Sequence, residues 1–379
     1  MQPELQSAVE ETAHADADAP RTRDPAPPPS PHEPRDFDWV FIGPHGLRAG
    51  WSILLFAALY YLFREVIGTL FFAAGLVSDT PIDSAAAVLV AELVPFFALI
   101  AAALIMVLIE DRGIFSYNLA GTHRVRHFVS GLVAGFAALS LLVAALAWGG
   151  WLRFGAASQS VAQAAAIGAL WAIAFLLVGS VEEGLFRCYA LSALARGINF
   201  WWALAAQIAI CLYLAFTGGG NGAWGVYLAA ALGLFPCLVL NQKFGARSAF
   251  WQAAWVTSTF FGFYHTSNTG ENWIGIFAAA FMGFAFCLSV RLTGSAWWAI
   301  GCHAAWDWAE TFFYGAADSG IQGQGHFLSA GPAGNPLWSG GADGPEGSLL
   351  VLGAILLLLL FLLAIYARNP AAPAAQPAD

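Results

Sequence analysis

QAAAIGALWAIAFLLVGSVEEGLFR, residues 163–187, is almost entirely apolar until it reaches two adjacent carboxylates and an arginine. About 20 apolar helical residues are enough to cross the hydrocarbon core of a bilayer. Similar runs occur elsewhere along the chain, at residues 49–76, 88–110, 128–152, 199–217, 223–241, 249–267, 273–291, 295–314 and 349–367. The sequence therefore predicts an all-α fold, a polytopic membrane helix bundle with about ten transmembrane helices.

The composition supports a lipid environment for most of the chain. Hydrophobic residues make up 59% of the 379 residues and charged residues only 10%, whereas soluble proteins carry roughly 25% charged residues. A soluble fold of this size cannot hide so much apolar surface. The net charge of −9 argues against nucleic acid as a partner. The lipid bilayer is the expected surrounding, with a membrane-associated peptide or protein as the expected substrate.

The distribution of charge and proline predicts the domain organisation. Residues 1–47 are acidic and rich in proline, which is typical of a disordered tail. Residues 48–368 form the predicted integral membrane domain, in which 315–348 is an outer loop rich in glycine, and 369–379 is a short flexible tail. With the amino terminus in the cytoplasm, every Lys and Arg except Arg64 and Arg153 falls on the cytoplasmic side. We therefore expect a multi-pass protein of the cell membrane with both termini cytoplasmic.

Ionisable residues inside the predicted spans are candidates for function, because a charge in hydrocarbon is costly. Arg64 and Glu65 lie in the first span and Glu92 near the start of the second. Adjacent opposite charges are often a structural pair or a link to a neighbouring helix. Glu92 is close enough to the end of its span to reach the interface.

The end of the fourth span carries a denser group. Glu183 and Arg187 are four residues apart, so they share one helix face and can form an ion pair. Glu182 points about 100° away and is left for another partner. The alternative is that both glutamates only mark the cytoplasmic end of the helix. The chain remains apolar from Cys188 to Leu194, which favours a position for Glu182 below the lipid surface.

Two later spans carry histidines. His265 ends the seventh span, and His303 lies four residues before Asp307 in the ninth, so those two share a face. Each is compatible with a structural role by itself. Together with Glu182, the two histidines form a set that could bind zinc or could activate water as a carboxylate and histidine pair.

At these residues the sequence resembles the CAAX protease and bacteriocin-processing family of intramembrane endopeptidases, also called the CPBP or ABI family. Its marks are EExxxR, FxxxH and HxxxN or HxxxD, in that order and on separate helices. They stand here as Glu182, Glu183 and Arg187; Phe261 and His265; His303 and Asp307. The runs GENWIG at 270–275, GSAWWAIGCHAAWDW at 294–308 and GGADGPEG at 340–347 add to the resemblance, which covers about residues 165–350.

The resemblance implies a helical membrane protease that hydrolyses a peptide bond near the membrane. It makes Glu182 the base that activates water, with His265 as its partner. His303 and Asp307 take the place of the pair that stabilises the oxyanion and orients the site, and Glu183 and Arg187 complete the candidate site. No cofactor is certain, and zinc bound by Glu182, His265 and His303 remains open.

One feature departs from the family pattern, in which EExxxR and FxxxH lie on consecutive helices. Residues 199–241 separate them here and are interpreted as an inserted helical pair. The candidate substrates are a prenylated C-terminal CAAX peptide, a leader peptide and a segment of a membrane protein. Two functions of other classes compete with the endopeptidase, a non-catalytic scaffold or immunity protein and a proton-coupled transporter.

Overall fold

The computed structural model describes residues 38–44, 46–77, 83–155, 160–197 and 223–367, with isolated positions between 201 and 216. It divides into two units, residues 1–40 and 41–379, and the second carries every feature discussed below. The predicted tail at 1–47 lies mostly outside the described residues. The predicted tail at 369–379 lies outside them entirely, as does most of the predicted helix at 199–217.

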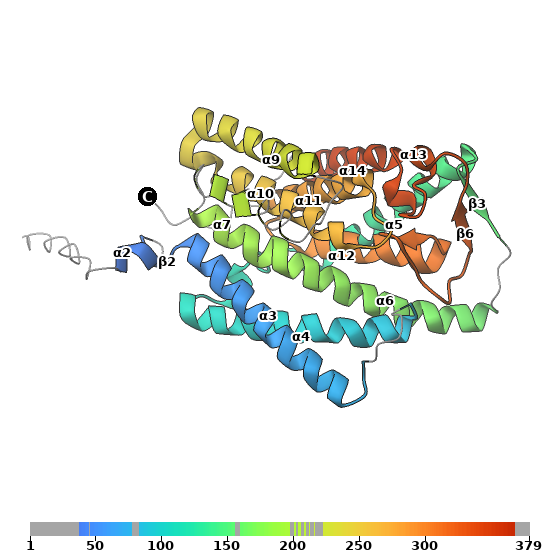
Figure 1. Ribbon diagram of the computed structural model, residues 1–379, viewed down its shortest axis with the longest axis horizontal. Helices are drawn as coiled ribbons and strands as arrows, with labels where there is room; N and C mark the ends of the chain where they lie inside the picture. Colours follow the sequence, from blue (N-terminus) through green and yellow to red (C-terminus); the bar gives the residue numbers. More distant parts are fainter. Residues whose placement is uncertain are drawn as a thin grey trace, which may run out of the picture. The chain divides into compact units, whose positions relative to one another are not determined.

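The second unit is mostly helical (Figure 1). Its longer helices are α3 (Ala49–Ala73), α4 (Ala85–Glu110), α5 (Arg124–Trp148), α6 (Val161–Glu183), α9 (Ala223–Phe244), α10 (Ala249–Tyr264), α11 (Trp273–Thr293), α12 (Trp297–Asp307) and α14 (Leu350–Tyr366). Its shorter ones are α7 (Leu191–Gly197), α13 (Pro336–Ser339), and the 3₁₀ segments η1 (Ile114–Ser116), η3 (Gly245–Ser248), η4 (His265–Ser267) and η6 (Pro345–Gly347). The short helix α2 (Asp38–Phe41) precedes them in the chain.

Short strands modify the expected all-α fold. Three antiparallel two-stranded ladders pair β1 (Ile42–Gly43) with β2 (Gly46–Leu47), β3 (Leu152–Phe154) with β6 (Ala330–Pro332), and β4 (Ala317–Asp318) with β5 (Ile321–Gln322). The β3–β6 ladder sets Leu152 opposite Pro332 and Phe154 opposite Ala330. The predicted outer loop therefore has structure of its own, because β4, β5, β6, α13 and η6 all lie within it.

Five helices of the described residues are long and apolar enough to cross a membrane, so the expected number of about ten spans is not supported. They cover Ala49–Ala73, Ala85–Glu110, Arg124–Trp148, Ala162–Gly197 and Trp273–Thr293, and α14 is a shorter apolar helix. The apolar runs at 249–267 and 295–314 exceed the α-helices that they form. α10 gives way to a 3₁₀ turn at His265, and α12 to a π-helical segment after Asp307. The chain is a polytopic helical membrane protein.

Two π-helical segments begin directly after motif carboxylates, and the first of them contains Arg187. η2 (Gly184–Ala190) begins after Glu183 and joins α6 to α7, and η5 (Trp308–Tyr314) begins after Asp307. Widened turns of this kind are rare and often occur at functional sites. They leave backbone groups free for other partners, and the carbonyl oxygen of Arg187 accepts a hydrogen bond from Asn118 Nδ2 at 2.7 Å.

Glycines let α12 lie unusually close to its two neighbours, α5 and α6. A Cβ atom built on Gly131 or Gly135 of α5 would clash with the carbonyl oxygen of Trp298 or Cys302 in α12. Gly131 and Gly135 form a GxxxG pattern, which permits such close approach in membranes. A Cβ on Gly179 of α6 would come within 3.2 Å of the Ala304 nitrogen of α12. The largest buried cluster joins α5, α11, α12 and α14, so α12 is held on several sides.

We expect Gly135→Ala to destabilise the protein by about 1–3 kcal/mol, because the added methyl group overpacks the contact between α5 and α12. Gly353→Ala in α14 is the matched control, since a Cβ there meets nothing within 4 Å. This control should be neutral or slightly stabilising, because alanine favours a helix more than glycine does. Thermal unfolding of the purified proteins in detergent measures both. Equal stability of the two variants would contradict the close packing of α12.

Candidate active site

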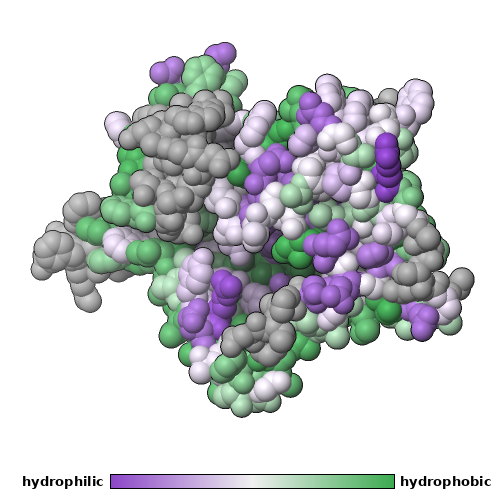
Figure 2. Space-filling view, turned by 45° about the vertical axis from the view of Figure 1, so that its right-hand side comes forward, coloured by the Kyte–Doolittle hydropathy of each residue, from purple (hydrophilic) through white to green (hydrophobic). Residues whose placement is uncertain are grey.

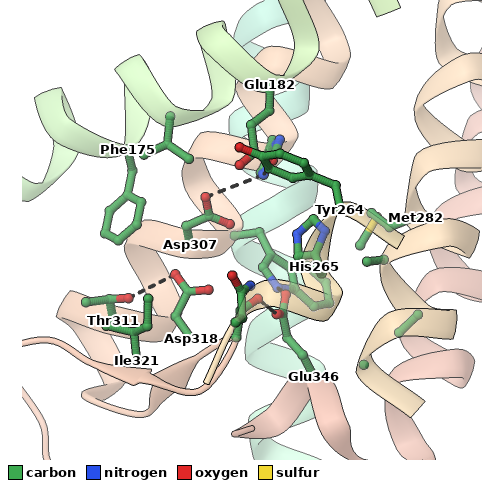
Figure 3. A pocket seen from close by; sticks show the side chains of 18 of the residues that line it. Phe175, Glu182, Tyr264, His265, Met282, Asp307, Thr311, Asp318, Ile321 and Glu346 are labelled. Atoms are coloured by element: carbon green, nitrogen blue, oxygen red, sulfur yellow. Dashed lines mark hydrogen bonds and ion pairs between the residues drawn. The ribbon is translucent and has the colours of Figure 1, made fainter. Parts of the chain in front are cut away.

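A cavity of about 390 Å³ brings together residues from α4, α6, α10, α11 and α12. Glu182, His265, His303 and Asp307 all line it, although they come from three separate regions of the chain. Glu182 descends from α6 in Figure 3, with Asp307 and His265 below it. Figure 2 shows hydrophilic residues around a hollow, and hydrophobic residues cover much of the surface below it in this view. The sequence motifs thus meet at one place in the fold.

A buried ion pair supports one wall of this site. Arg187 Nη1 lies 3.2 Å from Glu183 Oε1, and both side chains are fully buried. The Arg187 guanidinium lies over the Phe261 ring at 4.2 Å from its centroid, with Phe286 on another side at 5.4 Å. Cation–π contacts of this kind stabilise a desolvated guanidinium. The phenylalanine of FxxxH therefore packs on the arginine of EExxxR.

His303 is the residue that connects the three motifs. Its Nδ1 atom lies 2.9 Å from Glu183 Oε1, and because a carboxylate only accepts, the ring donates this hydrogen bond. Its Nε2 atom lies 3.6 Å from Glu182 Oε2 and 3.6 Å from Asp307 Oδ2. A protonated His303 could donate from both nitrogens, so it can present an N–H group toward the cavity.

The ring of His265 is fixed by its own helix. Its Nδ1 atom lies 2.8 Å from the carbonyl oxygen of Phe261. A carbonyl oxygen can only accept, so Nδ1 carries the hydrogen, and Nε2 of the neutral ring keeps a lone pair. His265 lines the cavity and can therefore accept a proton or orient a water molecule there.

Glu182 has the most open environment of the motif carboxylates. Its side chain is 20% exposed, whereas that of Glu183 is fully buried. No hydrogen bond of the described residues reaches its Oε2 atom. A partly exposed carboxylate at a cavity, beside a histidine that can donate, is the arrangement that general base catalysis needs.

These residues do not form a ready-made zinc site. Among the described residues, the only three His, Cys, Asp or Glu side chains with ligand atoms all within 4.8 Å of one another are Glu310, Asp318 and Glu346. Zinc holds its nitrogen and oxygen ligands at about 2.0–2.2 Å, so ligand atoms of one site lie within roughly 4.4 Å of one another. Glu182, His265 and His303 do not meet this condition as a set of three.

Glu92 and Tyr264 are among the cavity-lining residues to which the sequence assigned no role in the site. Glu92 lies in the cavity wall, and Tyr264 lies beside Glu182 (Figure 3). Arg64 and Glu65 line a separate hollow on α3. The charge of Glu92 in an apolar helix was the only signal for its position. Tyr264 had none beyond its place next to His265.

Hydrogen bonds join two further stretches of the sequence at one end of the site. The Asn272 side chain caps α11 by accepting from the Ile274 nitrogen at 2.8 Å, and it donates to the carbonyl oxygens of Gly340 and Gly347 at 3.2 Å each. The Asn272 nitrogen donates to Asp343 Oδ2 at 3.1 Å. The runs GENWIG and GGADGPEG therefore form one structural unit.

This unit brings several carboxyl groups together in a partly buried region. Burial, together with the charges of Asp343 and Glu346, raises the pKa of Glu271 to about 9. Burial and the charge of Glu346 likewise raise the pKa of Asp343 to about 7. Carboxylates that gain a proton so readily indicate a shortage of positive charge around them.

Comparison with known proteins places part of this site in a family. Residues 238–309 match the family described as type II CAAX prenyl endopeptidase Rce1-like. This segment is Rce1-like. The resemblance predicted from the motifs is thereby confirmed over α10, η4, α11 and α12, a stretch that includes His265, His303 and Asp307. Glu182, Glu183 and Arg187 lie outside the Rce1-like segment and join it through the contacts described above.

The other two comparisons add no relative. No curated protein matches the chain, and no solved structure matches it. The proposed function therefore rests on two observations, the Rce1-like match and the geometry of the cavity.

Proposed function

We propose that this protein is an intramembrane endopeptidase of the CPBP type, which hydrolyses a peptide bond near the membrane. The observation that carries the proposal is that Glu182 lines one cavity together with His265 and His303 of the Rce1-like segment. A proton-relaying transporter would not require this family match, and a scaffold would not require an open carboxylate beside two histidines.

In the proposed reaction, Glu182 takes a proton from a water molecule, and His265 orients that water through Nε2. The water oxygen attacks the peptide carbonyl carbon, which forms a tetrahedral intermediate with a negatively charged oxygen. His303 donates a hydrogen bond to this oxygen from Nε2, and such donors are among the largest contributors to catalysis. The C–N bond then breaks as Glu182 passes its proton to the leaving amine, and a carboxylic acid and an amine are released.

Glu183, Arg187 and Asp307 act in this scheme by positioning His303. The Glu183 carboxylate holds Nδ1 of the ring at 2.9 Å, and Arg187 balances the charge of Glu183. Asp307 Oδ2 approaches Nε2 from the other side of the ring at 3.6 Å. A ring held at Nδ1 is preorganised, so it loses little freedom when the oxyanion forms.

The walls of the cavity suggest the class of substrate. Trp171, Phe175, Met282 and Phe286 are among the apolar residues that line it. Such a wall suits a peptide that is lipid-modified or embedded in the membrane. We therefore propose a prenylated C-terminal CAAX peptide as the first substrate to test, with leader peptides and membrane-protein segments as alternatives.

Cleavage profiling tests the function. Membrane extracts containing the wild-type protein should release peptide fragments that are absent without the protein and absent with Glu182→Ala. A zinc-selective chelator should leave this activity unchanged, because the proposed base is Glu182 itself. Identical profiles for all three extracts would favour a non-catalytic scaffold. Activity that is lost with the chelator and restored by stoichiometric zinc would make Glu182 a ligand instead of the base.

A further inference from the structure

Three carboxylates meet beside the cavity at a place that the proposed reaction does not use. Glu310 comes from η5, Asp318 from β4 and Glu346 from η6. One oxygen of each lies within 4.8 Å of an oxygen of the other two. Asp318 and Glu346 also line the cavity, and Figure 3 shows both at its lower end. The cluster therefore joins the helix that follows Asp307 to two separate points of the 315–348 segment.

Glu310 is the feature that points to a ligand-binding role for this cluster. Its side chain is fully buried, and neither of its carboxylate oxygens has a hydrogen-bond partner among the described residues. A buried carboxylate without any partner is strongly unfavourable. One of its oxygens is directed at the cluster, because it lies within reach of both other carboxylates. Among the described residues, none of the three carboxylates forms an ion pair within 4.0 Å.

The other two carboxylates are already held in place by donors. Thr311 Oγ1 donates to Asp318 Oδ2 at 3.1 Å. Trp306 Nε1 donates to Glu346 Oε1 at 2.8 Å, and Ser319 Oγ donates to Glu346 Oε2 at 3.0 Å. Metal ligands are commonly oriented in this way by partners outside the coordination sphere. Each oxygen retains a second lone pair that could bind a cation.

Positive charge is scarce around the cluster. The sequence between Gly315 and Gly347 contains no Lys or Arg. Asp343, also fully buried, has an Oδ1 atom with no hydrogen-bond partner among the described residues. A bound cation would supply positive charge that balances these acidic side chains.

We propose that Glu310, Asp318 and Glu346 bind a hard divalent cation, with calcium the best fit. Oxygen-only ligands suit calcium and magnesium, whereas zinc sites usually include nitrogen or sulfur. Two oxygens on one cation can be separated by at most twice the bond length, which is about 4.6–5.2 Å for calcium and roughly 4.0–4.2 Å for magnesium. The three oxygens lie within 4.8 Å of one another, a spacing that the longer calcium–oxygen bonds can span.

The proposed cation would fasten the 315–348 segment to the end of α12. η5 continues directly from Asp307, so a cation on Glu310 would fix the helix that carries His303. The inference does not depend on peptide cleavage, since binding and stability report on it without a substrate. Failure of the protease proposal would leave this test unaffected.

Thermal unfolding in detergent tests the site after treatment with a calcium chelator. About 1 mM calcium should raise the unfolding temperature of the wild-type protein by a few degrees, and the same magnesium concentration should have a smaller effect. Glu310→Gln should abolish the calcium shift and raise the stability of the calcium-free protein, because it removes an unpaired buried charge. Glu65→Gln on α3, which lies outside the cluster, is the matched control and should keep the shift.

Terbium luminescence gives a second measurement. Terbium is a calcium substitute, and Trp306 is hydrogen-bonded to Glu346, so excitation of tryptophan should sensitise terbium bound at the cluster. Calcium should compete this signal away, and Trp306→Phe should reduce it. If Glu310→Gln fails to fold, Asp318→Asn is tested in its place. The proposal is overturned if the wild-type protein shows no calcium shift, or if Glu310→Gln responds to calcium as Glu65→Gln does.

Discussion

Replacing Glu182 with glutamine should reduce peptide cleavage by about 10²–10⁴-fold, which is the usual contribution of a general base. Glutamine keeps the size of the side chain and can still contact His303, but it cannot take a proton from water. Glu182 is 20% exposed at the cavity, and its Oε2 atom forms no hydrogen bond among the described residues. The substitution therefore breaks no hydrogen bond of this oxygen and should cost little stability. The variant should insert into the membrane and unfold at nearly the same temperature as the wild type.

The matched control for this prediction is Glu65→Gln, the same chemical change in α3 outside the main cavity. It should retain cleavage close to that of the wild type. Rates are compared on one prenylated peptide in reconstituted vesicles, at equal amounts of folded protein. If Glu182→Gln keeps more than about a tenth of the wild-type rate, Glu182 is not the base.

Glu183→Gln and Arg187→Ala should each destabilise the protein by about 3–5 kcal/mol, because each leaves the other partner charged and buried. Both side chains are fully buried, and Arg187 is enclosed by the rings of Phe261 and Phe286. The amount of monodisperse protein after purification and the thermal unfolding temperature report the loss.

The double variant Glu183→Gln with Arg187→Met is the control for this effect. It removes both charges and keeps apolar bulk beside the aromatic rings, so it should recover part of the lost stability. Its cleavage should stay low, because His303 loses the carboxylate that holds Nδ1. The roles of the two glutamates would have to be exchanged if Glu183→Gln were folded but inactive while Glu182→Gln remained active.

The sequence was a sound guide to the apolar helices and to the motif residues. The expected runs at 49–76, 88–110 and 273–291 coincide closely with α3, α4 and α11, because long apolar runs leave few alternatives to a helix. The spacing of Glu183 and Arg187 correctly gave an ion pair. Which catalytic role each motif residue has remains a prediction.

Other features depended on contacts between distant segments. Nothing in the local pattern showed that α10 would stop at Tyr264 or α12 at Asp307, so two of the expected spans are shorter helices among the described residues. The contact of His303 with both Glu182 and Glu183 depends on how α6 and α12 approach each other. Glu346 lay in a segment interpreted as an outer loop and as part of the family resemblance, and neither reading placed it beside Glu310.

The two widened turns have a practical meaning for anyone who would build this site into a new scaffold. Each residue of a regular helix advances by about 100° around the axis. A π-helical turn takes up one more residue than an α-helical turn, so everything beyond η2 or η5 is offset relative to a regular helix. A designer who copied EExxxR onto an ideal straight helix would keep Glu182 and Glu183 in place and misdirect Arg187, and beyond HxxxD would misdirect Glu310. The irregular backbone would have to be transferred together with the side chains.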